Sequence, residues 1–181
     1  MLSQEFLSML LKQYEASFDI YSPFEIENRE YPAYGYFFSH GEKYVLTREA
    51  KLWEADSYEH ILFQTADAID REHLQEMQRL AEEYIEPFLI RNGEKFPAEN
   101  HMYSYITLIL LSDQPVDKTT EKIIKGYKFH KNYKFSIRGY SLVRILCVDV
   151  SRGKITANRA AKPLVKTYKK FIKLFYKYRR T

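Results

Sequence analysis

The sequence predicts an α/β (α+β) fold in which a single mixed β-sheet is flanked by helices. Short apolar runs typical of strands alternate with longer stretches whose apolar residues recur every three to four positions. The chain has 181 residues, the usual size of one domain, and 45% of them are hydrophobic, which is enough for a core. Because no linker or repeat divides the chain, residues 1–181 are expected to form one domain with the element order α-β-β-β-α-β-α-β-β-α.

The first hundred residues are expected to form a helix, three strands and a second helix. Ser3 is suited to cap a helix that runs to about Ser17, and an irregular acidic segment follows over residues 23–32. Strands are predicted over residues 34–39, 43–53 and 58–65, with a turn at residues 40–42. Asp70 then caps a long amphipathic helix, which Pro87 should kink or end.

The remaining residues are expected to supply the centre of the sheet and two more helices. The predicted elements are a strand over residues 101–113, a helix over 118–125, strands over 142–150 and 154–157, and a last helix over 161–178. The first of these strands is apolar on both faces, which indicates a central position. Asp117 suits the cap of the helix after it. Asp113 stands where α/β folds place ligand groups, and it equally suits a turn.

The net charge of +4 conceals a strong asymmetry along the chain. Residues 1–100 hold 9 basic and 20 acidic residues, a net charge of −11, whereas residues 101–181 hold 19 basic and 4 acidic residues, a net charge of +15. The simplest explanation is attraction between the two halves within one fold. The alternatives are head-to-tail association into a homo-oligomer, or an external polyanion bound by the basic half.

The last predicted helix has an apolar face and a purely basic face. The basic face includes Lys166, Lys169, Lys170, Lys173 and Lys177, with no acidic residue among them. A helix docked on the core with lysines at its rim is the simplest interpretation. However, like charges four residues apart repel by about 0.2–0.5 kcal/mol per pair, so phosphate binding is the sharper explanation. An anionic membrane surface would also suit such a helix.

A second basic segment combines lysines with aromatic rings. Lys128, Lys131 and Lys134 alternate with Tyr127, Phe129, Tyr133 and Phe135. Cations for phosphates beside rings for base stacking are what a single-stranded nucleic-acid surface needs. The simpler interpretation is an edge element whose rings point inward and whose lysines point to solvent.

Most catalytic motifs are absent from the sequence. There is no glycine-rich phosphate loop, no Gly-x-Ser-x-Gly elbow and no pair of histidines at zinc-helix spacing, so we predict neither a cofactor nor a metal site. Cys147 lies in an apolar run and is expected to be a buried, inert thiol.

One pair of residues leaves an enzymatic alternative open. Glu49 and Lys51 would share one face of a strand, as the carboxylate and lysine of metal-dependent nucleases do. The predicted order α-β-β-β-α-β also resembles the core of restriction-endonuclease-like nucleases. That family places an Asp on the preceding strand, and this sequence has none there.

The segment from His101 to Val150, with HMYSYITLILLSD and RGYSLVRILCVDV, resembles a family of uncharacterised proteins from Gram-positive bacteria. The resemblance rests on apolar strands and their spacing, and it implies a bacterial origin without implying an activity. No apolar run approaches 18 residues, and the first residues lack the pattern of a secretory signal, so we expect a cytoplasmic protein.

Taken together, the sequence favours a non-enzymatic binding protein whose basic C-terminal half contacts nucleic acid or another polyanion. A nuclease-like enzyme that uses Glu49 and Lys51 is one alternative. A structural scaffold that associates with itself through opposite charges is the other.

Overall fold

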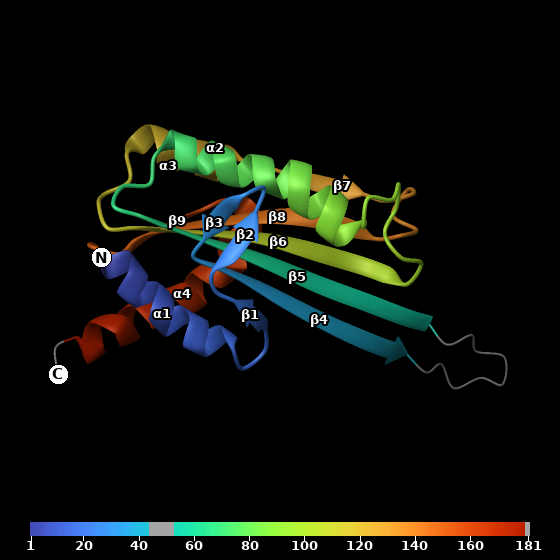
Figure 1. Ribbon diagram of the computed structural model, residues 1–181, viewed down its shortest axis with the longest axis horizontal. Coiled ribbons are helices and arrows are strands. Elements are labelled where there is room, and N and C mark those ends of the chain that lie inside the picture. The colour runs from blue at the N-terminus through green and yellow to red at the C-terminus, as the bar shows by residue number, and fades with distance from the viewer. Residues whose placement is uncertain (44–52, 180–181) are drawn as a thin grey trace.

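The computed structural model describes residues 1–43 and 53–179, which form a sheet with helices on both faces (Figure 1). The helices are α1 (Leu2–Tyr14), α2 (Arg71–Leu80), its π-helical continuation η1 (Ala81–Ile90), α3 (Lys118–Gly126), the short 3-10 helix η2 (Arg159–Ala161) and α4 (Lys162–Tyr178). The strands are β1 (Asp19–Tyr21), β2 (Phe24–Ile26), β3 (Arg29–Tyr31), β4 (Ala33–Lys43), β5 (Trp53–Ala66), β6 (His101–Ser112), β7 (His130–Asn132), β8 (Tyr140–Asp149) and β9 (Lys154–Ala157).

The main sheet is mixed, which confirms the predicted fold class. Its strand order is β1-β4-β5-β6-β8-β7, and β9 also pairs with β8. β4 and β5 are antiparallel, whereas β5, β6 and β8 run parallel to one another at the centre. β7 and β9 lie antiparallel along the outer side of β8, and β2 pairs with β3 in a small separate sheet.

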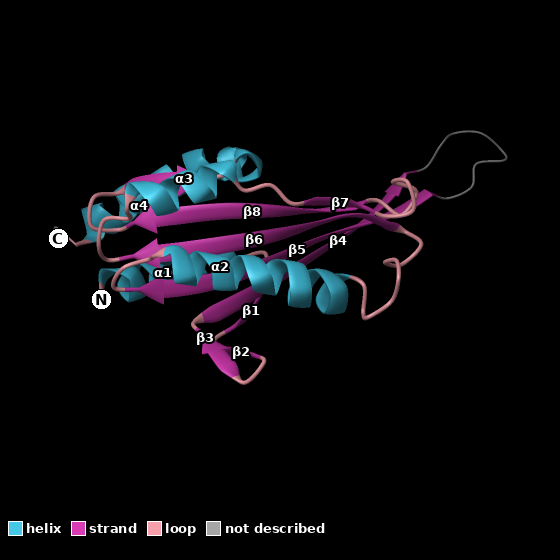
Figure 2. Ribbon diagram, turned by 90° about the horizontal axis from the view of Figure 1, so that it is seen from above, coloured by secondary structure: helices cyan, strands magenta, loops and turns pink. Residues whose placement is uncertain are grey.

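Two apolar cores lie on the two faces of the sheet. α2, η1 and α3 cover one face, and α1 and α4 cover the other (Figures 1 and 2). The first core includes Leu62, Leu74, Met77, Ile85, Leu108 and Val143. The second includes Phe6, Leu10, Ile61, Phe63, Ile109, Leu146 and Tyr168. Neighbouring residues of β6, such as Leu108 and Ile109, enter opposite cores, so the strand is buried on both faces from Ile106 onward, as its sequence predicts.

The predicted turn at residues 40–42 is wrong. These residues continue β4 and pair with β5, His40 opposite Asp56 and Gly41 opposite Ala55. Most of the strand predicted over residues 43–53 lies outside the described residues. The hydrogen bond from His40 Nδ1 to Asp56 Oδ1, at 2.6 Å, joins the two strands at this point. Cross-strand pairing of this length outweighs the local turn preference of one glycine.

The segment over residues 23–32 is not irregular, as was predicted, but contains the β2–β3 hairpin. Glu27 and Asn28 form its two-residue turn with φ angles of 52° and 63°. Positive φ at both central positions is the geometry of a type I′ turn, which usually contains glycine. Because Glu-Asn lacks that signature, the sequence pattern did not reveal this hairpin.

The helix termini show which capping predictions hold. Asp70 and Asp117 accept hydrogen bonds from backbone N–H groups of the helices that follow them, as predicted. Ser3 does not cap α1, which ends at Tyr14. Instead the Ser3 N–H donates to the carboxylate of Asp113, at the end of β6, so the acid that caps this helix is 110 residues away.

Pro87 does not end the second helix. The helix changes from α to π geometry at Ala81 and continues past Pro87 to Ile90. Its end lies near Gly93, which has a φ of 77° and donates its N–H to the carbonyl oxygen of Pro87. A glycine in this conformation is the usual end of a helix.

The strand order places the two oppositely charged halves side by side. β1, β4 and β5 belong to the acidic half, whereas β6, β7, β8 and β9 belong to the basic half, and the halves join where β5 pairs with β6. Within the described residues, four cation–carboxylate pairs bridge the halves: Glu5–Arg179, Glu59–Arg144, Glu86–Lys131 and Glu99–Arg138. None of them includes a lysine of α4.

Asn158 closes a gap in the outer edge of the sheet. β7 pairs with the first part of β8 and β9 with its last part, which leaves the outer side of the middle of β8 without a neighbouring strand. The buried Asn158 fills this gap: its Oδ1 accepts from Ile145 N at 3.0 Å, and its Nδ2 donates to Val143 O at 3.1 Å. Oδ1 also accepts from Ala161 N, so the same side chain starts η2.

Candidate functional site

Seven of the eight lysines predicted to bind a polyanion are exposed on the structure. They are Lys128, Lys134, Lys166, Lys169, Lys170, Lys173 and Lys177. In the part of the chain that the structure describes, none of these seven forms an ion pair. Such ammonium groups are available to an external anion.

Lys131 differs from the other seven. Its Nζ lies 3.0 Å from Oε2 of Glu86, a carboxylate that is buried. Moving an ammonium away from a buried carboxylate costs free energy. Lys131 therefore stabilises the fold, and it could bind an external anion only after leaving Glu86.

The two predicted lysine groups lie on different parts of the molecule (Figures 1 and 2). Segment 128–134 contains β7, on the outer edge of β8, whereas α4 packs with α1 over one face of the sheet. Lys128 and Arg159, which precedes α4, line a hollow of about 400 Å³ together with Leu142, and the described residues that line it include no lysine of α4. We call the seven exposed lysines and Arg159 the basic edge.

The aromatic rings of this segment do not share one environment. Tyr133 is buried with 1% exposure, as expected for a ring that points inward, whereas Phe135 is 98% exposed. Lys134, Phe135 and Ser136 have φ angles of 47°, 55° and 67°. This left-handed turn presents Phe135 to solvent beside Lys134.

A second site, which the sequence did not indicate, lies on the opposite face of the sheet. It is a pocket of about 690 Å³ between the sheet and the segment after η1. The residues that line it include Tyr36, Tyr58, His60, Arg91, Lys95, Phe96, His101, Ser104 and Arg138. π-helices and β-bulges often adjoin functional sites, and both are present here.

A bulge in β6 turns two polar side chains toward this pocket. Asp56 pairs with His101 and the next residue, Ser57, pairs with Tyr103, so Met102 is the extra residue. Without the bulge, His101 and Ser104 would point to opposite faces, because side chains alternate along a strand.

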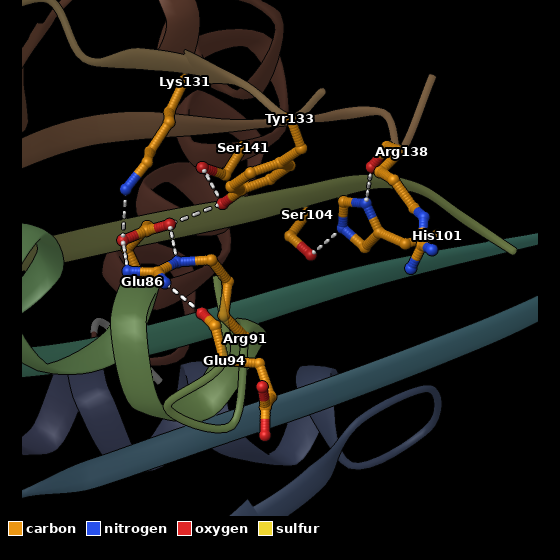
Figure 3. A network of polar contacts seen from close by, with 9 residues as sticks. All are labelled: Glu86, Arg91, Glu94, His101, Ser104, Lys131, Tyr133, Arg138 and Ser141. Atoms are coloured by element: carbon orange, nitrogen blue, oxygen red, sulfur yellow. Dashed lines mark hydrogen bonds and ion pairs between the residues drawn. The ribbon is translucent and has the colours of Figure 1, made fainter. Parts of the chain in front are cut away.

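His101 is held in one tautomer by its two hydrogen bonds (Figure 3). Its Nδ1 lies 2.7 Å from the carbonyl oxygen of Arg138, which only accepts, so Nδ1 carries the proton. Burial lowers the pKa of His101, and the neutral ring then accepts at Nε2 from Ser104 Oγ at 2.8 Å. Because Ser104 has no exposed surface, this contact orients the imidazole and does not present a nucleophile.

His60 is a second neutral imidazole at the same pocket. Burial, with a smaller effect of His101, lowers its pKa to about 4. Its Nδ1 lies 2.6 Å from the hydroxyl of Tyr34, and burial keeps that phenol protonated by raising its pKa. The pocket is thus lined by two uncharged rings, and both ring nitrogens of His101 already have partners within the protein.

Next to the pocket, the buried carboxylate of Glu86 accepts hydrogen bonds from three residues (Figure 3). The donors are Arg91 Nε at 2.7 Å, Tyr133 Oη at 2.8 Å and Lys131 Nζ at 3.0 Å. Burial by itself would raise the pKa of this carboxyl, but the three donors outweigh burial and hold the pKa below its ordinary value. The network ties η1 to β7, so it joins the acidic and basic halves.

Comparison with known proteins shows the family of this chain. The model of a domain of unknown function, DUF8052, matches residues 2–170. The chain belongs to the DUF8052 family. No curated protein and no solved structure matches it. The match confirms the prediction of an uncharacterised family and extends well beyond residues 101–150, on which that prediction rested; the Gram-positive origin stays a prediction.

Glu49 and Lys51, the predicted nuclease pair, lie outside the residues that the structure describes. Over residues 1–43 and 53–179, no group of three or more His, Cys, Asp or Glu side chains is arranged to hold a metal ion. Cys147 is buried, and burial raises the pKa of its thiol, which agrees with the predicted inert role. Within the same ranges, no helix is long and apolar enough to cross a membrane.

The sequence does not identify the two histidines and Glu86 as site residues, for one reason. His60, Glu86 and His101 come from three elements and share no short motif. A bulge and a π-helix bring them together, and neither has a reliable sequence signal.

We predict that Glu86→Gln lowers the free energy of unfolding of the DUF8052 domain by about 2 kcal/mol at neutral pH. Because the pKa of Glu86 is lower in the folded state than its ordinary 4.5, its ionised form stabilises the fold above that pH. The contribution is lost as the pH falls through the folded-state pKa. Urea unfolding between pH 7 and pH 3.5 should therefore show a flatter pH dependence for the variant.

The matched control is Glu30→Gln, which removes the same charge from an exposed side chain on β3. It should change the free energy of unfolding by less than about 0.5 kcal/mol at pH 7. Equal pH dependence in Glu86→Gln and the parent chain would contradict the assignment of this network.

Proposed function

We propose that this DUF8052 domain binds nucleic acid through its basic edge. The observation that supports the proposal most directly is the row of exposed lysines on α4, whose side chains have no carboxylate partner in the described structure. A solvated helix face normally mixes both signs of charge, because neighbouring lysines repel. Phosphates spaced along a backbone would relieve this repulsion and release counterions.

The charge distribution over the fold supports an external partner. The acidic and basic halves lie side by side, and the bridging ion pairs do not include the lysines of α4. The ion pairs between the two halves therefore leave the positive charges of the basic edge without carboxylate partners among the described residues. The field of such an edge attracts polyanions at long range.

The apolar face of α4 argues for nucleic acid over a membrane surface. Tyr168, Ile172 and Phe175 of this face are buried in the core with α1 and the sheet. A helix that lies in a membrane interface inserts its apolar face among the lipids. In α4 the residues of that face are already buried against the protein, and the exposed face carries the lysines.

Fluorescence anisotropy with labelled 20-nucleotide DNA and RNA, titrated between 25 and 200 mM KCl, tests the proposal. We expect log Kd to rise linearly with log salt concentration. The double variant Lys169→Gln/Lys173→Gln should weaken binding and reduce the salt slope by about 1.4, since each lost phosphate contact contributes about 0.7 on a single strand.

The control is Lys95→Gln/Lys122→Gln, which removes two exposed positive charges, one at the 690 Å³ pocket and one on α3, from the face of the sheet opposite α4. Its salt slope should equal that of the parent chain. Absence of binding at 25 mM KCl, or equal loss in both double variants, would refute the proposal.

The same samples distinguish the two alternatives from the sequence. Oligonucleotides shortened in Mg²⁺, with the activity lost in Glu49→Gln, would favour the nuclease. A sedimentation mass that rises at low salt without oligonucleotide would favour a self-associating scaffold. A nucleic-acid ligand agrees with the cytoplasmic location that we expect, which cell fractionation would test.

A further inference from the structure

The helices on the α1 and α4 side leave part of the sheet uncovered (Figure 1). The core on this side is built from the later residues of β6 and β8, such as Ile109 and Leu146. Tyr103 and Tyr140 precede them on the same face, since side chains alternate along each strand, and the two residues are paired. Both are partly exposed and lie outside that core.

Rings from three adjacent strands form a continuous surface here, the tyrosine platform (Tyr103, Tyr105, His130, Tyr140 and Arg144). The ring centroids of Tyr103 and Tyr105 are 4.7 Å apart, and those of Tyr103 and Tyr140 are 6.0 Å apart with planes inclined by only 26°. The ring of His130 meets Tyr140 edge-on at 5.1 Å. These rings are already ordered, so little side-chain entropy remains to be lost when a ligand binds.

A cation lies on the platform itself. The guanidinium carbon of Arg144 is 3.4 Å from the ring centroid of Tyr105. Glu59 is the carboxylate nearest to it, at 3.5 Å, and Thr107 also donates to that carboxylate. The Nε atom of Arg144 is buried without a hydrogen-bond partner among the described residues. Stacked arginine planes are a recurring support for nucleic-acid bases.

The tyrosine platform adjoins the part of the basic edge that Lys128 and Arg159 form. His130 belongs to the platform, and it lines the 400 Å³ hollow together with these two residues. A strand whose phosphates contact Lys128 and Arg159 can therefore turn its bases toward the tyrosines.

We propose that the tyrosine platform stacks unpaired bases, so that the ligand of this domain is single-stranded nucleic acid. The inference rests on the proposed function and makes it more specific. In a duplex, each base is covered on both faces by its neighbours, and no ring surface is available to a protein sheet. In a single strand, bases can be splayed onto aromatic side chains while cations follow the backbone.

The test compares Tyr140→Leu and Tyr103→Leu with the parent chain on a single-stranded 20-mer and on the corresponding duplex. Leucine keeps apolar cover on the sheet but removes the stacking ring. We expect each variant to bind the single strand at least fivefold more weakly, the effect of losing one stacked base. The salt slope should not change, because no phosphate contact is lost.

Phe88→Leu is the matched control, since Phe88 is 55% exposed on η1 and belongs to the other side of the sheet. It should leave both affinities unchanged. Thermal unfolding of all variants verifies that each one folds.

The outcomes separate the two proposals. Salt-dependent binding of equal strength to single strand and duplex, unaffected by Tyr140→Leu, would refute the platform and keep the basic edge. Equal losses on single strand and duplex in the tyrosine variants would also refute it, because the rings would then act only through the fold. Absence of any salt-dependent binding by the parent chain would refute both proposals.

Discussion

Replacement of Gly139 by alanine should lower the free energy of unfolding by about 3–5 kcal/mol, one of the two largest effects that we expect from a single substitution in this protein. A Cβ atom on Gly139 would lie 2.0 Å from the carbonyl oxygen of Met102 and 2.9 Å from that of His101. Both contacts are with backbone, so no side chain can rotate away. The φ angle of 71° adds the cost of a left-handed conformation.

Gly93→Ala separates the two causes of this loss. Gly93 has a similar φ of 77°, but nothing lies within 4 Å of its added Cβ. This variant should cost only about 1–2 kcal/mol, the price of the conformation alone. Urea denaturation of both variants measures the difference, and equal losses would contradict the assignment of steric contact between Gly139 and the bulge at Met102.

Substitution of Asn158 by alanine should lower the free energy of unfolding by about 3–4 kcal/mol. The amide of this buried side chain serves Ile145 N and Val143 O, two backbone groups in the middle of β8. Without Asn158 these groups are buried and lack partners, and each such group costs about 1–3 kcal/mol. The start of η2 also loses the acceptor for Ala161 N.

Amide hydrogen exchange gives this prediction a local readout. The Ile145 amide should exchange faster in Asn158→Ala than the loss of global stability explains, because its acceptor is gone. Asn132→Ala, at an exposed position on β7, is the control and should cost less than about 1 kcal/mol. Unchanged exchange at Ile145 would show that a solvent molecule replaces the side chain.

The elements that the sequence predicted well are those specified by local signals. β6 is apolar from Leu108 to Leu111, α4 separates apolar and basic faces, and Asp70 and Asp117 stand directly before the helices that they cap. Each of these signals acts within a few residues of chain, where spacing and side-chain chemistry suffice. The exposed lysines of α4 belong to the same class, since an amphipathic helix hides one face only.

Two of the wrong predictions concern contacts between distant residues. Residues 40–42 pair with β5 instead of forming a turn, and Asp113 supplies the helix cap that was expected from Ser3. The β2–β3 hairpin and the π-helix around Pro87 have weak or misleading local patterns. For the turn and the cap, the competing interaction comes from another element, and its strength depends on a geometry that spacing along the chain does not encode.

The candidate sites divide in the same way. Composition and helical spacing alone determined that the C-terminal half is basic and that α4 presents lysines to solvent. Only the tertiary structure decided that the acidic and basic halves lie side by side, that tyrosines of β6 and β8 form one platform, and that His60 and His101 share a pocket. The physical reason is that periodicity specifies which face of an element is apolar, whereas strand order and a single bulge specify which faces meet.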